Sequence, residues 1–402
     1  MSVPPSGRIL VVGASLAGLR AAERLRKDGF EGELTLLGSE THLPYDRPPL
    51  SKELLKGERE PDGIALRLAP ELDASWLLGE TATELDLGAR VVRTGAGREL
   101  AFDGLVIATG SAPRRLRGLE PELPGILELR TLEHSLELRE RLGRRPHLLV
   151  VGCGFIGVEV ASTARALGAD VTIVSLDPPL AVAGELVSGV AAAMLADHGV
   201  TLHIGRTVSE VLGDERFEGV VLDDGARIEA DLALVAVGAA PVTGWLEGSG
   251  IELRDGVVCD ASCAAIGVDD VVAAGDVARW PNPVFDSAPM RIEHWTNAVE
   301  QGNAAAITLL RGSGPDTAYA PVPSFWSDHF GTRVQSVGLP ALADETTVVD
   351  GSLEERRFVA ECRRDGRLVG AITYGMPRGL LKYRIALARG KPSAPEAAEL
   401  AS

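Results

Sequence analysis

One local pattern occurs twice in this sequence: a short apolar run, a glycine-rich turn and a segment with helical periodicity. The first copy starts at Arg8 and turns at Gly13–Gly18, and the second starts at His147 and turns at Gly152–Gly157. A strand that turns sharply into a helix aims unpaired backbone N–H groups and the positive end of the helix dipole at one point, where a pyrophosphate fits. Two copies therefore predict two dinucleotide-binding sites; the alternative is a duplicated fold in which one copy is vestigial.

The two copies differ in their match to G-x-G-x-x-G. The second is complete, whereas the first has Ser15 in place of the middle glycine, a small residue that still permits a fairly close approach. Two further segments, Leu105–Gly110 and Val271–Asp276, each predict a buried strand that ends in a tight turn. Asp276 at such a strand end is placed to accept hydrogen bonds from sugar or ribityl hydroxyls, and its alternative role is a helix N-cap.

Composition excludes several classes of protein. A chain of 402 residues is long enough for two or three domains, and a formal net charge of −17 argues against general nucleic-acid binding. Four cysteines cannot form a disulfide framework, and Cys259 and Cys263 have no histidine cluster beside them that would favour a metal site. No signal peptide is evident, and no apolar run reaches the ~18 residues of a bilayer span. We expect a cytoplasmic enzyme without membrane insertion and without a metal site.

Four further strings narrow the choice of family. They are His42–Lys52, Leu129–Thr131, Arg291–Asn297 and Phe325–His329. The two glycine-rich turns and the two strand-end segments, in their order along the chain, resemble the flavoprotein disulfide reductase superfamily. The four strings resemble, more narrowly, the FAD-dependent NAD(P)H:ferredoxin reductases that serve oxygenases and cytochromes P450, the group of putidaredoxin and rubredoxin reductases. This group belongs to the flavoprotein disulfide reductase superfamily, and the resemblance extends from about residue 7 to about residue 375.

The resemblance implies an α/β fold with two Rossmann-like dinucleotide-binding domains, one for FAD and one for NAD, and a C-terminal α+β domain. We expect a discontinuous FAD domain at 1–115 and 242–320, an inserted NAD(H) domain at 116–241, and a last domain at 321–402 that covers the flavin. Short alternating segments after about residue 320 themselves predict a small antiparallel sheet with a closing helix near 377–389.

The resemblance also implies which residues form the sites. The FAD pyrophosphate would lie against Gly13, Ser15, Ala17 and Gly18. The other residues expected to bind FAD are Ser39, Glu40, Arg47, Pro48, Lys52, Thr83, Ala108, Thr109, Gly110, Arg130, Gly275, Asp276, Glu293, His294, Trp295 and Trp326. The residues expected to bind NAD(H) are Gly152, Gly154, Phe155, Ile156, Gly157, Glu159 and Ser175.

Lys52 and Glu159 are the predicted catalytic residues. They match a Lys–Glu pair that lies near flavin N5 in the superfamily, where a cation would stabilise negative charge on the reduced flavin. The glutamate would reduce the desolvation cost of burying that cation. The alternative is a solvated lysine and a glutamate on an exposed helix face.

The second nucleotide unit departs from the expected pattern at Ser175. A carboxylate at that strand end would bind the ribose 2′-hydroxyl and repel a 2′-phosphate, but the nearest acid is Asp177, two residues on. No Arg or Lys occurs between Ser175 and Gly205 to bind a 2′-phosphate instead. We expect NADH as the donor, with NADPH less favoured.

The sequence has no cysteine before Cys153, so it lacks the redox cysteines of the disulfide-reducing relatives. Electrons must then leave the flavin directly. The expected function is hydride transfer from NADH to FAD, followed by single-electron transfer to an iron–sulfur ferredoxin that supplies a cytochrome P450 or dioxygenase. The alternatives are a rubredoxin reductase, a flavin NADH oxidase, and a redox-sensing flavoprotein of the apoptosis-inducing-factor type.

One segment reverses the acidic character of the chain. Residues 376–391 contain no acid and five cations, which are Arg378, Lys382, Arg384, Arg389 and Lys391. This segment has two possible roles: steering an acidic ferredoxin towards the enzyme, or placing cations at the C-terminal end of a helix to complement its dipole.

Overall fold

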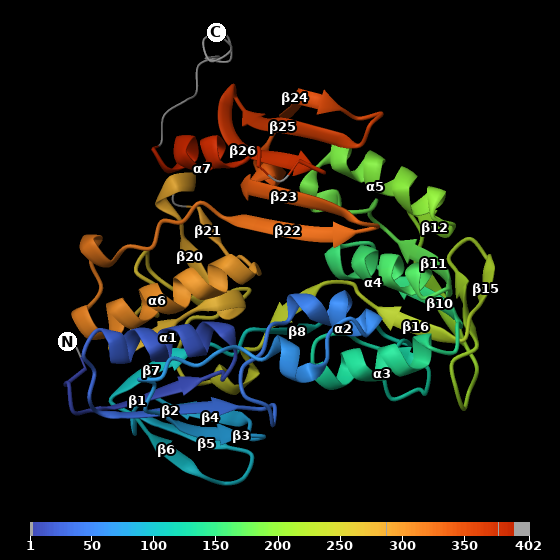
Figure 1. Ribbon diagram of the computed structural model, residues 1–402. Coiled ribbons are helices and arrows are strands. Elements are labelled where there is room, and N and C mark those ends of the chain that lie inside the picture. The colour runs from blue at the N-terminus through green and yellow to red at the C-terminus, as the bar shows by residue number, and fades with distance from the viewer. Residues whose placement is uncertain (1–2, 287, 377, 390–402) are drawn as a thin grey trace. The chain divides into compact units, whose positions relative to one another are not determined.

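A computed structural model describes residues 3–286, 288–376 and 378–389, which divide into two compact units. Unit 1 comprises Met1–Asp46, Ala65–Ala112 and Ala240–Pro323. Unit 2 comprises Arg47–Ile64, Pro113–Ala239 and Ser324–Ser402. Each unit is therefore assembled from three segments that are distant in the sequence, as the colours of Figure 1 show.

Unit 1 is built on a parallel sheet of five strands in the order β19-β7-β1-β2-β3. Its strands are β1 (Arg8–Val12), β2 (Glu33–Gly38), β3 (Ser75–Leu78), β7 (Gly104–Ile107) and β19 (Val271–Ala273). The central strands are almost continuously apolar and buried, as expected where both faces of a sheet are covered. Helices α1 (Leu16–Lys27) and α6 (Trp295–Arg311) lie side by side against this sheet (Figure 1).

Shorter elements complete unit 1. A three-stranded antiparallel sheet consists of β4 (Ala82–Asp86), β5 (Val91–Thr94) and β6 (Glu99–Ala101). A second small sheet consists of β18 (Val257–Val258), β20 (Ala278–Pro281) and β21 (Pro289–Met290). The unit boundaries at 112/113 and 239/240 fall within the short strands β8 (Ser111–Pro113) and β17 (Ala239–Pro241).

Unit 2 repeats the parallel architecture with the strand order β12-β11-β10-β16-β9. These strands are β9 (Ile126–Leu127), β10 (His147–Val151), β11 (Asp170–Ser175), β12 (Val200–Ile204) and β16 (Leu232–Val235). The helices of this part are α2 (Glu53–Lys56), α3 (Leu132–Leu142), α4 (Phe155–Ala166) and α5 (Glu185–Asp197). A small antiparallel sheet, β13 (Val208–Leu212), β14 (Gly219–Leu222) and β15 (Arg227–Glu229), joins the parallel sheet through a core that includes Leu149, Val220 and Val235.

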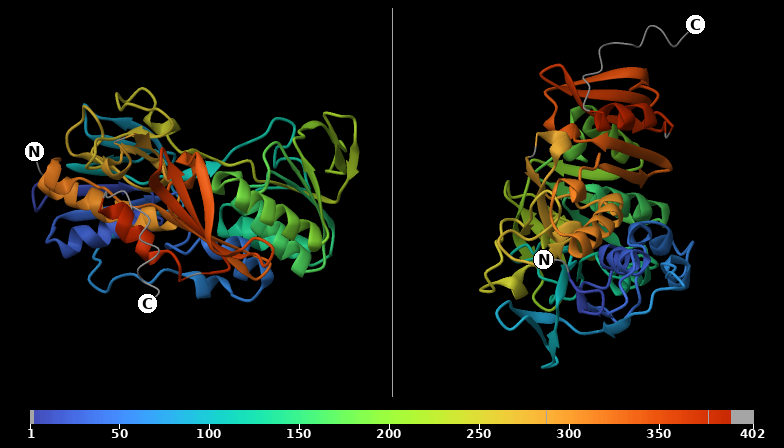
Figure 2. Two further views of the ribbon diagram at one scale, coloured as in Figure 1. Left: turned by 90° about the horizontal axis from the view of Figure 1, so that it is seen from above. Right: turned by 90° about the vertical axis from the view of Figure 1, so that its left-hand side faces the viewer.

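The C-terminal part of unit 2 is an antiparallel sheet of five strands in the order β22-β23-β26-β25-β24. Its strands are β22 (Ser324–His329), β23 (Thr332–Gly338), β24 (Glu345–Ser352), β25 (Arg357–Arg364) and β26 (Arg367–Tyr374). Helix α7 (Leu381–Ala388) packs on β23 and β26, and Figure 2 shows it in red beside the sheet. The Phe330 ring stacks on His198, with centroids 4.0 Å apart, so the β22–β23 turn is attached to the end of α5.

This architecture confirms the predicted fold class: two Rossmann-type parallel sheets and a C-terminal antiparallel sheet. The division into three domains at the predicted residues stays a prediction, because residues from 324 onwards group with the second parallel sheet in unit 2. Among the residues that the structure describes, no helix has the length and apolar character needed to cross a bilayer.

Candidate functional site: two nucleotide cradles and a buried lysine–glutamate pair

The first glycine-rich turn lies at the carboxyl edge of the unit 1 sheet. Strands β1 and β7 are neighbours, and the strand order proceeds in opposite directions from them, towards β2 on one side and β19 on the other. A dinucleotide binds at such a switch point, outside the carboxyl ends of the strands. Because the strands are parallel, this edge also receives Ser39 after β2, Ala108–Gly110 after β7, and Gly275 and Asp276 after β19.

Close backbone contacts explain the glycines of this first cradle. Gly13 has φ +117°, and a Cβ there would lie 2.0 Å from the carbonyl oxygen of Ala108. A Cβ on Gly18 would lie 2.0 Å from the carbonyl oxygen of Gly13. Ser15 is the N-cap residue of α1, and Ala17 is buried in its first turn. The turn therefore has the compact shape that lets backbone N–H groups approach a pyrophosphate.

Asp276 is held at the end of β19 by its neighbours within unit 1. Its Oδ2 accepts a hydrogen bond of 2.8 Å from the Ser111 hydroxyl, and its carbonyl oxygen accepts one of 3.1 Å from Arg291. Gly275 N donates to Gln301 Oε1 on α6 over 2.9 Å. Burial lowers the pKa of His294 to about 4 against the opposing charge of Asp276, so this imidazole is neutral at pH 7. The carboxylate is thus a fixed acceptor at the edge where the cradle lies.

The remaining predicted FAD residues of unit 1 have varied positions. The indole N–H of Trp295 donates to Asp46 Oδ1 over 2.9 Å, and Glu293 pairs with Arg291. Glu40 accepts a hydrogen bond from the Tyr45 hydroxyl. Thr109 Oγ1 donates to the Val242 carbonyl over 2.7 Å. Thr83 lies exposed on β4, in the antiparallel sheet, where its hydroxyl donates to Arg93 O over 3.2 Å.

The second glycine-rich turn forms a matching cradle in unit 2, between β10 and α4. A Cβ on Gly152 (φ +103°) would lie 2.3 Å from Ala236 O, and one on Gly157 would lie 2.2 Å from Gly152 O. A Cβ on Gly154 would have no atom within 4 Å, so the space in front of the helix N-terminus is open. The Phe155 ring packs against the Phe325 ring, with the two ring centroids 4.7 Å apart. Ile156, in the first turn of α4, is exposed.

The end of β11, where the ribose of the second nucleotide is expected, has a neutral and buried residue. Ser175 is the last residue of β11, and its carbonyl oxygen accepts from the amides of Gly205 (2.8 Å) and Arg206 (3.3 Å). Arg206, directly after Gly205, was not predicted as part of this site, and its guanidinium pairs with Asp224 at 2.9 Å. The parallel pairing of β11 with β12, which the sequence pattern alone did not establish, brings this residue near Ser175.

Lys52 and Glu159 form a buried ion pair within unit 2. Lys52 Nζ lies 2.7 Å from Glu159 Oε2, and their side chains are 11% and 5% exposed. The same oxygen accepts a hydrogen bond of 2.6 Å from the Ser51 hydroxyl. The other oxygen, Oε1, accepts a hydrogen bond of 2.8 Å from the Ser327 hydroxyl and one of 3.4 Å from the Asp328 amide. The solvated arrangement that was the alternative for this pair is therefore wrong.

Helix α4 carries this pair on a buried polar face. Thr163, one turn after Glu159, donates to Ser51 O over 2.8 Å, and Ser162 Oγ accepts from Phe330 N over 2.7 Å. Polar side chains at this spacing normally lie on the solvent side of a helix. Here they bind the 51–52 segment on one side and the hairpin that starts with β22 on the other, so the helix of the second cradle positions both segments.

The other predicted FAD residues of unit 2 lie near these segments in sequence. Arg47 donates to the Arg130 carbonyl over 2.6 Å, which joins the turn at Pro48 to the start of α3. Trp326 is half-buried on β22, next to Ser327. All four cysteines of the sequence are buried free thiols. Burial raises the pKa of the thiols of Cys153 and Cys263 to about 12 and that of Cys362 to about 11, which keeps them protonated.

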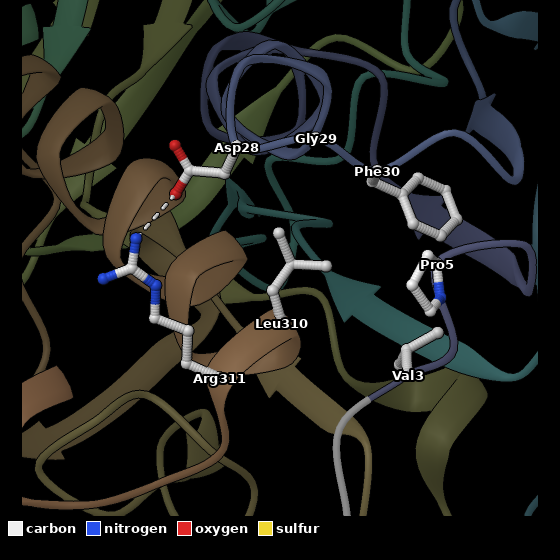
Figure 3. Close-up of a pocket in the computed structure, with 7 residues that line it drawn as sticks. All are labelled: Val3, Pro5, Asp28, Gly29, Phe30, Leu310 and Arg311. Atoms are coloured by element: carbon white, nitrogen blue, oxygen red, sulfur yellow. Dashed lines mark ion pairs between the residues drawn. The ribbon is translucent and has the colours of Figure 1, made fainter.

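Both cradles fit the nucleotides that the sequence predicts. Close backbone contacts leave no room for a Cβ at Gly13, Gly18, Gly152 or Gly157, whereas the position of a Cβ on Gly154 is open. The pocket in Figure 3 is a different feature, with a volume of about 270 Å³. Val3, Phe30, Arg311 and its other lining residues lie at the amino edge of the unit 1 sheet or at the ends of α1 and α6, away from the cradle.

The cationic segment near the C-terminus forms α7 and the turn before it. Arg378, Lys382, Arg384 and Arg389 are all exposed, and Lys391 lies outside the described residues. Two apolar side chains of the same helix face solvent, Leu381 with 69% and Ile385 with 44% exposure. The helix thus presents cations together with exposed apolar surface.

Comparison with known proteins agrees with this geometry. Residues 7–302 match the family described as pyridine nucleotide-disulphide oxidoreductase, and residues 324–401 match the reductase C-terminal family. Rhodocoxin reductase of Rhodococcus erythropolis is 34% identical over 97% of this chain and 91% of its own length. The ferredoxin–NAD(+) reductase subunit of a benzene 1,2-dioxygenase system from Pseudomonas putida is 35% identical over 93% and 90%.

The solved structures include a ferredoxin reductase for the CYP199A2 system from Rhodopseudomonas palustris. It is 32% identical to this chain, with a TM-score of 0.91 over 97% of this chain and 96% of its own. The family match covers both cradles, and these similarities extend over nearly the whole chain. This chain belongs to the pyridine nucleotide-disulphide oxidoreductase family, whose members use FAD and a pyridine nucleotide.

Proposed function

We propose that this protein is an NADH-dependent ferredoxin reductase that supplies a cytochrome P450 or a dioxygenase. The relatives named above are reductase components of such systems. The observation that carries the proposal is the combination of two nucleotide cradles with a buried lysine–glutamate pair and no reactive thiol. When bound, FAD supplies acceptance of a hydride from NADH and release of electrons one at a time.

The cradle of unit 1 is proposed to bind the FAD pyrophosphate through the backbone at Gly13–Gly18. Asp276, already fixed by Ser111 and Arg291, would accept hydrogen bonds from the hydroxyls of the cofactor. The cradle of unit 2 would bind the pyrophosphate of NADH in front of α4, where Gly154 leaves open space.

Lys52 is proposed to act as a fixed positive charge at the flavin. Its ammonium is desolvated, and a charge in such surroundings acts more strongly than one in water. Glu159 keeps that charge oriented, since it is itself fixed by Ser51 and Ser327. No acid–base catalyst is required for hydride transfer, so the pair binds and orients without giving up a proton.

Electrons are proposed to leave without a thiol relay. Each cysteine is buried, and burial raises its pKa well into the range where the unreactive thiol dominates at pH 7. The acceptor must then be a separate redox protein. Because the relatives described above are ferredoxin reductases, a ferredoxin is favoured for this role over the alternative, rubredoxin.

Anaerobic titration of the FAD-loaded protein tests this proposal. Addition of NADH should bleach the flavin absorbance, and subsequent addition of an oxidised [2Fe–2S] ferredoxin should restore it while the ferredoxin is reduced. Flavin that neither NADH nor NADPH bleaches would contradict the proposal. Rapid aerobic turnover without a protein acceptor would favour an NADH oxidase, and a long-lived complex with NADH and feeble turnover would favour a redox-sensing flavoprotein.

A further inference from the structure

The carboxyl ends of β11 and β12 bring an arginine close to the expected ribose position. Ser175 pairs with Ile204 in the parallel register, and the Ser175 carbonyl oxygen accepts hydrogen bonds from both Gly205 N and Arg206 N. In a Rossmann-type unit, the residue at the end of the second strand meets the ribose 2′-hydroxyl. That residue is the uncharged Ser175, so rejection of a 2′-phosphate must come from elsewhere. Arg206 directly follows Gly205 after the neighbouring strand, and its amide bonds the Ser175 carbonyl, so its long side chain starts close to this position.

The guanidinium of Arg206 already has a partner in this structure. Its Nε lies 2.9 Å from Asp224 Oδ2, in the turn between β14 and β15. Two further bonds fix this turn against the chain after Arg206: Asp223 N donates to Thr207 O over 3.0 Å, and Thr207 N donates to Asp223 Oδ1 over 3.3 Å. The Arg206 and Asp224 side chains are 43% and 33% exposed, so a ligand can reach them.

We propose that the Arg206–Asp224 pair sets the choice between NADH and NADPH. Asp224 forms an ion pair with the Arg206 guanidinium and repels a second anion, so a 2′-phosphate gains no net attraction at this position. Asp224, in the turn between two strands of the antiparallel sheet, thus repels a 2′-phosphate in place of the carboxylate that is missing at the end of β11. This inference rests on the proposed use of a pyridine nucleotide by unit 2, and it adds the residues that select the nucleotide.

Binding of two small nucleotides to the FAD-loaded protein tests this assignment directly. Adenosine 2′,5′-bisphosphate and 5′-AMP differ only in the 2′-phosphate, and calorimetry gives the affinity of each. In Asp224→Asn, the affinity for adenosine 2′,5′-bisphosphate should rise about five- to tenfold while that for 5′-AMP changes less than about twofold. The additional change Arg206→Ala should abolish this gain. The kcat/KM for NADPH should rise in Asp224→Asn and fall again in the double variant.

Matched variants separate this effect from general changes in charge. Glu229→Gln removes one carboxylate from the exposed Arg227–Glu229 pair on β15, 3.8 Å apart, and should leave both affinities unchanged. Asp177→Asn removes the acid nearest to Ser175 in sequence and should have less effect than Asp224→Asn. FAD absorbance and the thermal midpoint should match the wild type in every variant.

Several results would overturn the inference. They are an unchanged affinity ratio in Asp224→Asn, a gain that persists in the double variant, a larger gain in Asp177→Asn, and a wild-type protein that already binds the bisphosphate more tightly than 5′-AMP. If NADH reduces the flavin but the ratio of the two nucleotide affinities is the same in Asp224→Asn as in the wild type, only this inference is contradicted. A protein whose flavin neither nucleotide reduces contradicts the proposed function instead.

Discussion

Glu159 is a buried carboxylate that accepts four hydrogen bonds, two on each oxygen. The donors come from residues 51–52 and 327–328, more than one hundred residues away in either direction. Removing one member of a buried charge pair costs about 3–5 kcal/mol, because the remaining charge is left uncompensated. The sequence predicted the pair through resemblance, but it did not predict Ser51 and Ser327, because nothing local in a sequence marks a contact of this length.

The first prediction concerns Lys52. Replacement Lys52→Ala should slow flavin reduction by NADH about tenfold or more, because the buried positive charge is lost. Stopped-flow absorbance measures this rate. Lys56→Ala, on the exposed side of the neighbouring helix α2, is the control and should reduce at the wild-type rate. Equal rates in the two variants would rule out the proposed role of Lys52.

The second prediction concerns Ser327. Ser327→Ala leaves Glu159 Oε1 with only the 3.4 Å bond from Asp328 N, and we expect a loss of about 1–3 kcal/mol in the free energy of unfolding. The control is Ser336→Ala on β23, because the buried Ser336 hydroxyl has no hydrogen-bond partner in the described part of the chain. Urea unfolding should show that Ser336→Ala is neutral within about 0.5 kcal/mol. A similar loss in both variants would contradict the role assigned to Ser327.

Among the elements, α4 was predicted from the sequence as a helix, but its contacts were not. The glycine turn and helical period predicted α4, because both signals are local. Its buried polar face was not predicted, since Glu159, Ser162 and Thr163 at helical spacing are equally typical of a solvated face. Arg206 was missed for a related reason: its neighbourhood depends on the pairing of β11 with β12, and strand order is not visible in a single sequence.

The third prediction concerns the cationic segment that contains α7. Arg378 and Lys382 lie before and in the first turn of this helix, and no basic residue lies in its last turn, so these two cations do not complement the helix dipole. If they steer an acidic ferredoxin, the double change Arg378→Glu and Lys382→Glu should lower kcat/KM for ferredoxin about tenfold at low ionic strength. The wild-type value should also fall as salt is added, because salt screens exposed charges. Arg144→Glu, at the exposed end of α3, is the control. If salt has no effect on wild-type kcat/KM, these cations do not steer the ferredoxin.

At the scale of the whole molecule, the predicted family and fold class are confirmed. Two local repeats and a few strings of residues were enough for this, because β1 and β10 are each encoded together with their glycine-rich turn in one short segment. The grouping of residues was harder to predict. Segment 47–64 belongs to unit 2 although it lies between two segments of unit 1, and no composition change marks its ends.

The fourth prediction concerns acid stability. Burial lowers the pKa of His294 in unit 1 and of His329 in unit 2 from 6.5 to about 4, so both are neutral in the folded protein. Between pH 6.5 and about 4 the unfolded chain binds protons that the folded chain does not, and stability falls as pH falls. The slope is about 1.4 kcal/mol per pH unit for each such group.

Urea unfolding at pH 7, 6 and 5 measures this dependence. His329→Gln should flatten it, because glutamine binds no proton in either state. His203→Gln, on the partly exposed strand β12, is the control and should keep the wild-type dependence. An unchanged slope in His329→Gln would show that this imidazole does not contribute.

The hydroxyl of Ser327 and the amide of Asp328 have a consequence for biosynthesis. The residues of α4 leave the ribosome long before β22 is synthesised. The carboxylate of Glu159 then lacks the two hydrogen bonds that Ser327 and Asp328 donate, so its burial is costly at that stage. The second cradle reaches its final packing only after residues near 330 have left the exit tunnel. Proteolysis of ribosome-bound chains of increasing length should therefore show late protection of α4, well after its own residues are exposed.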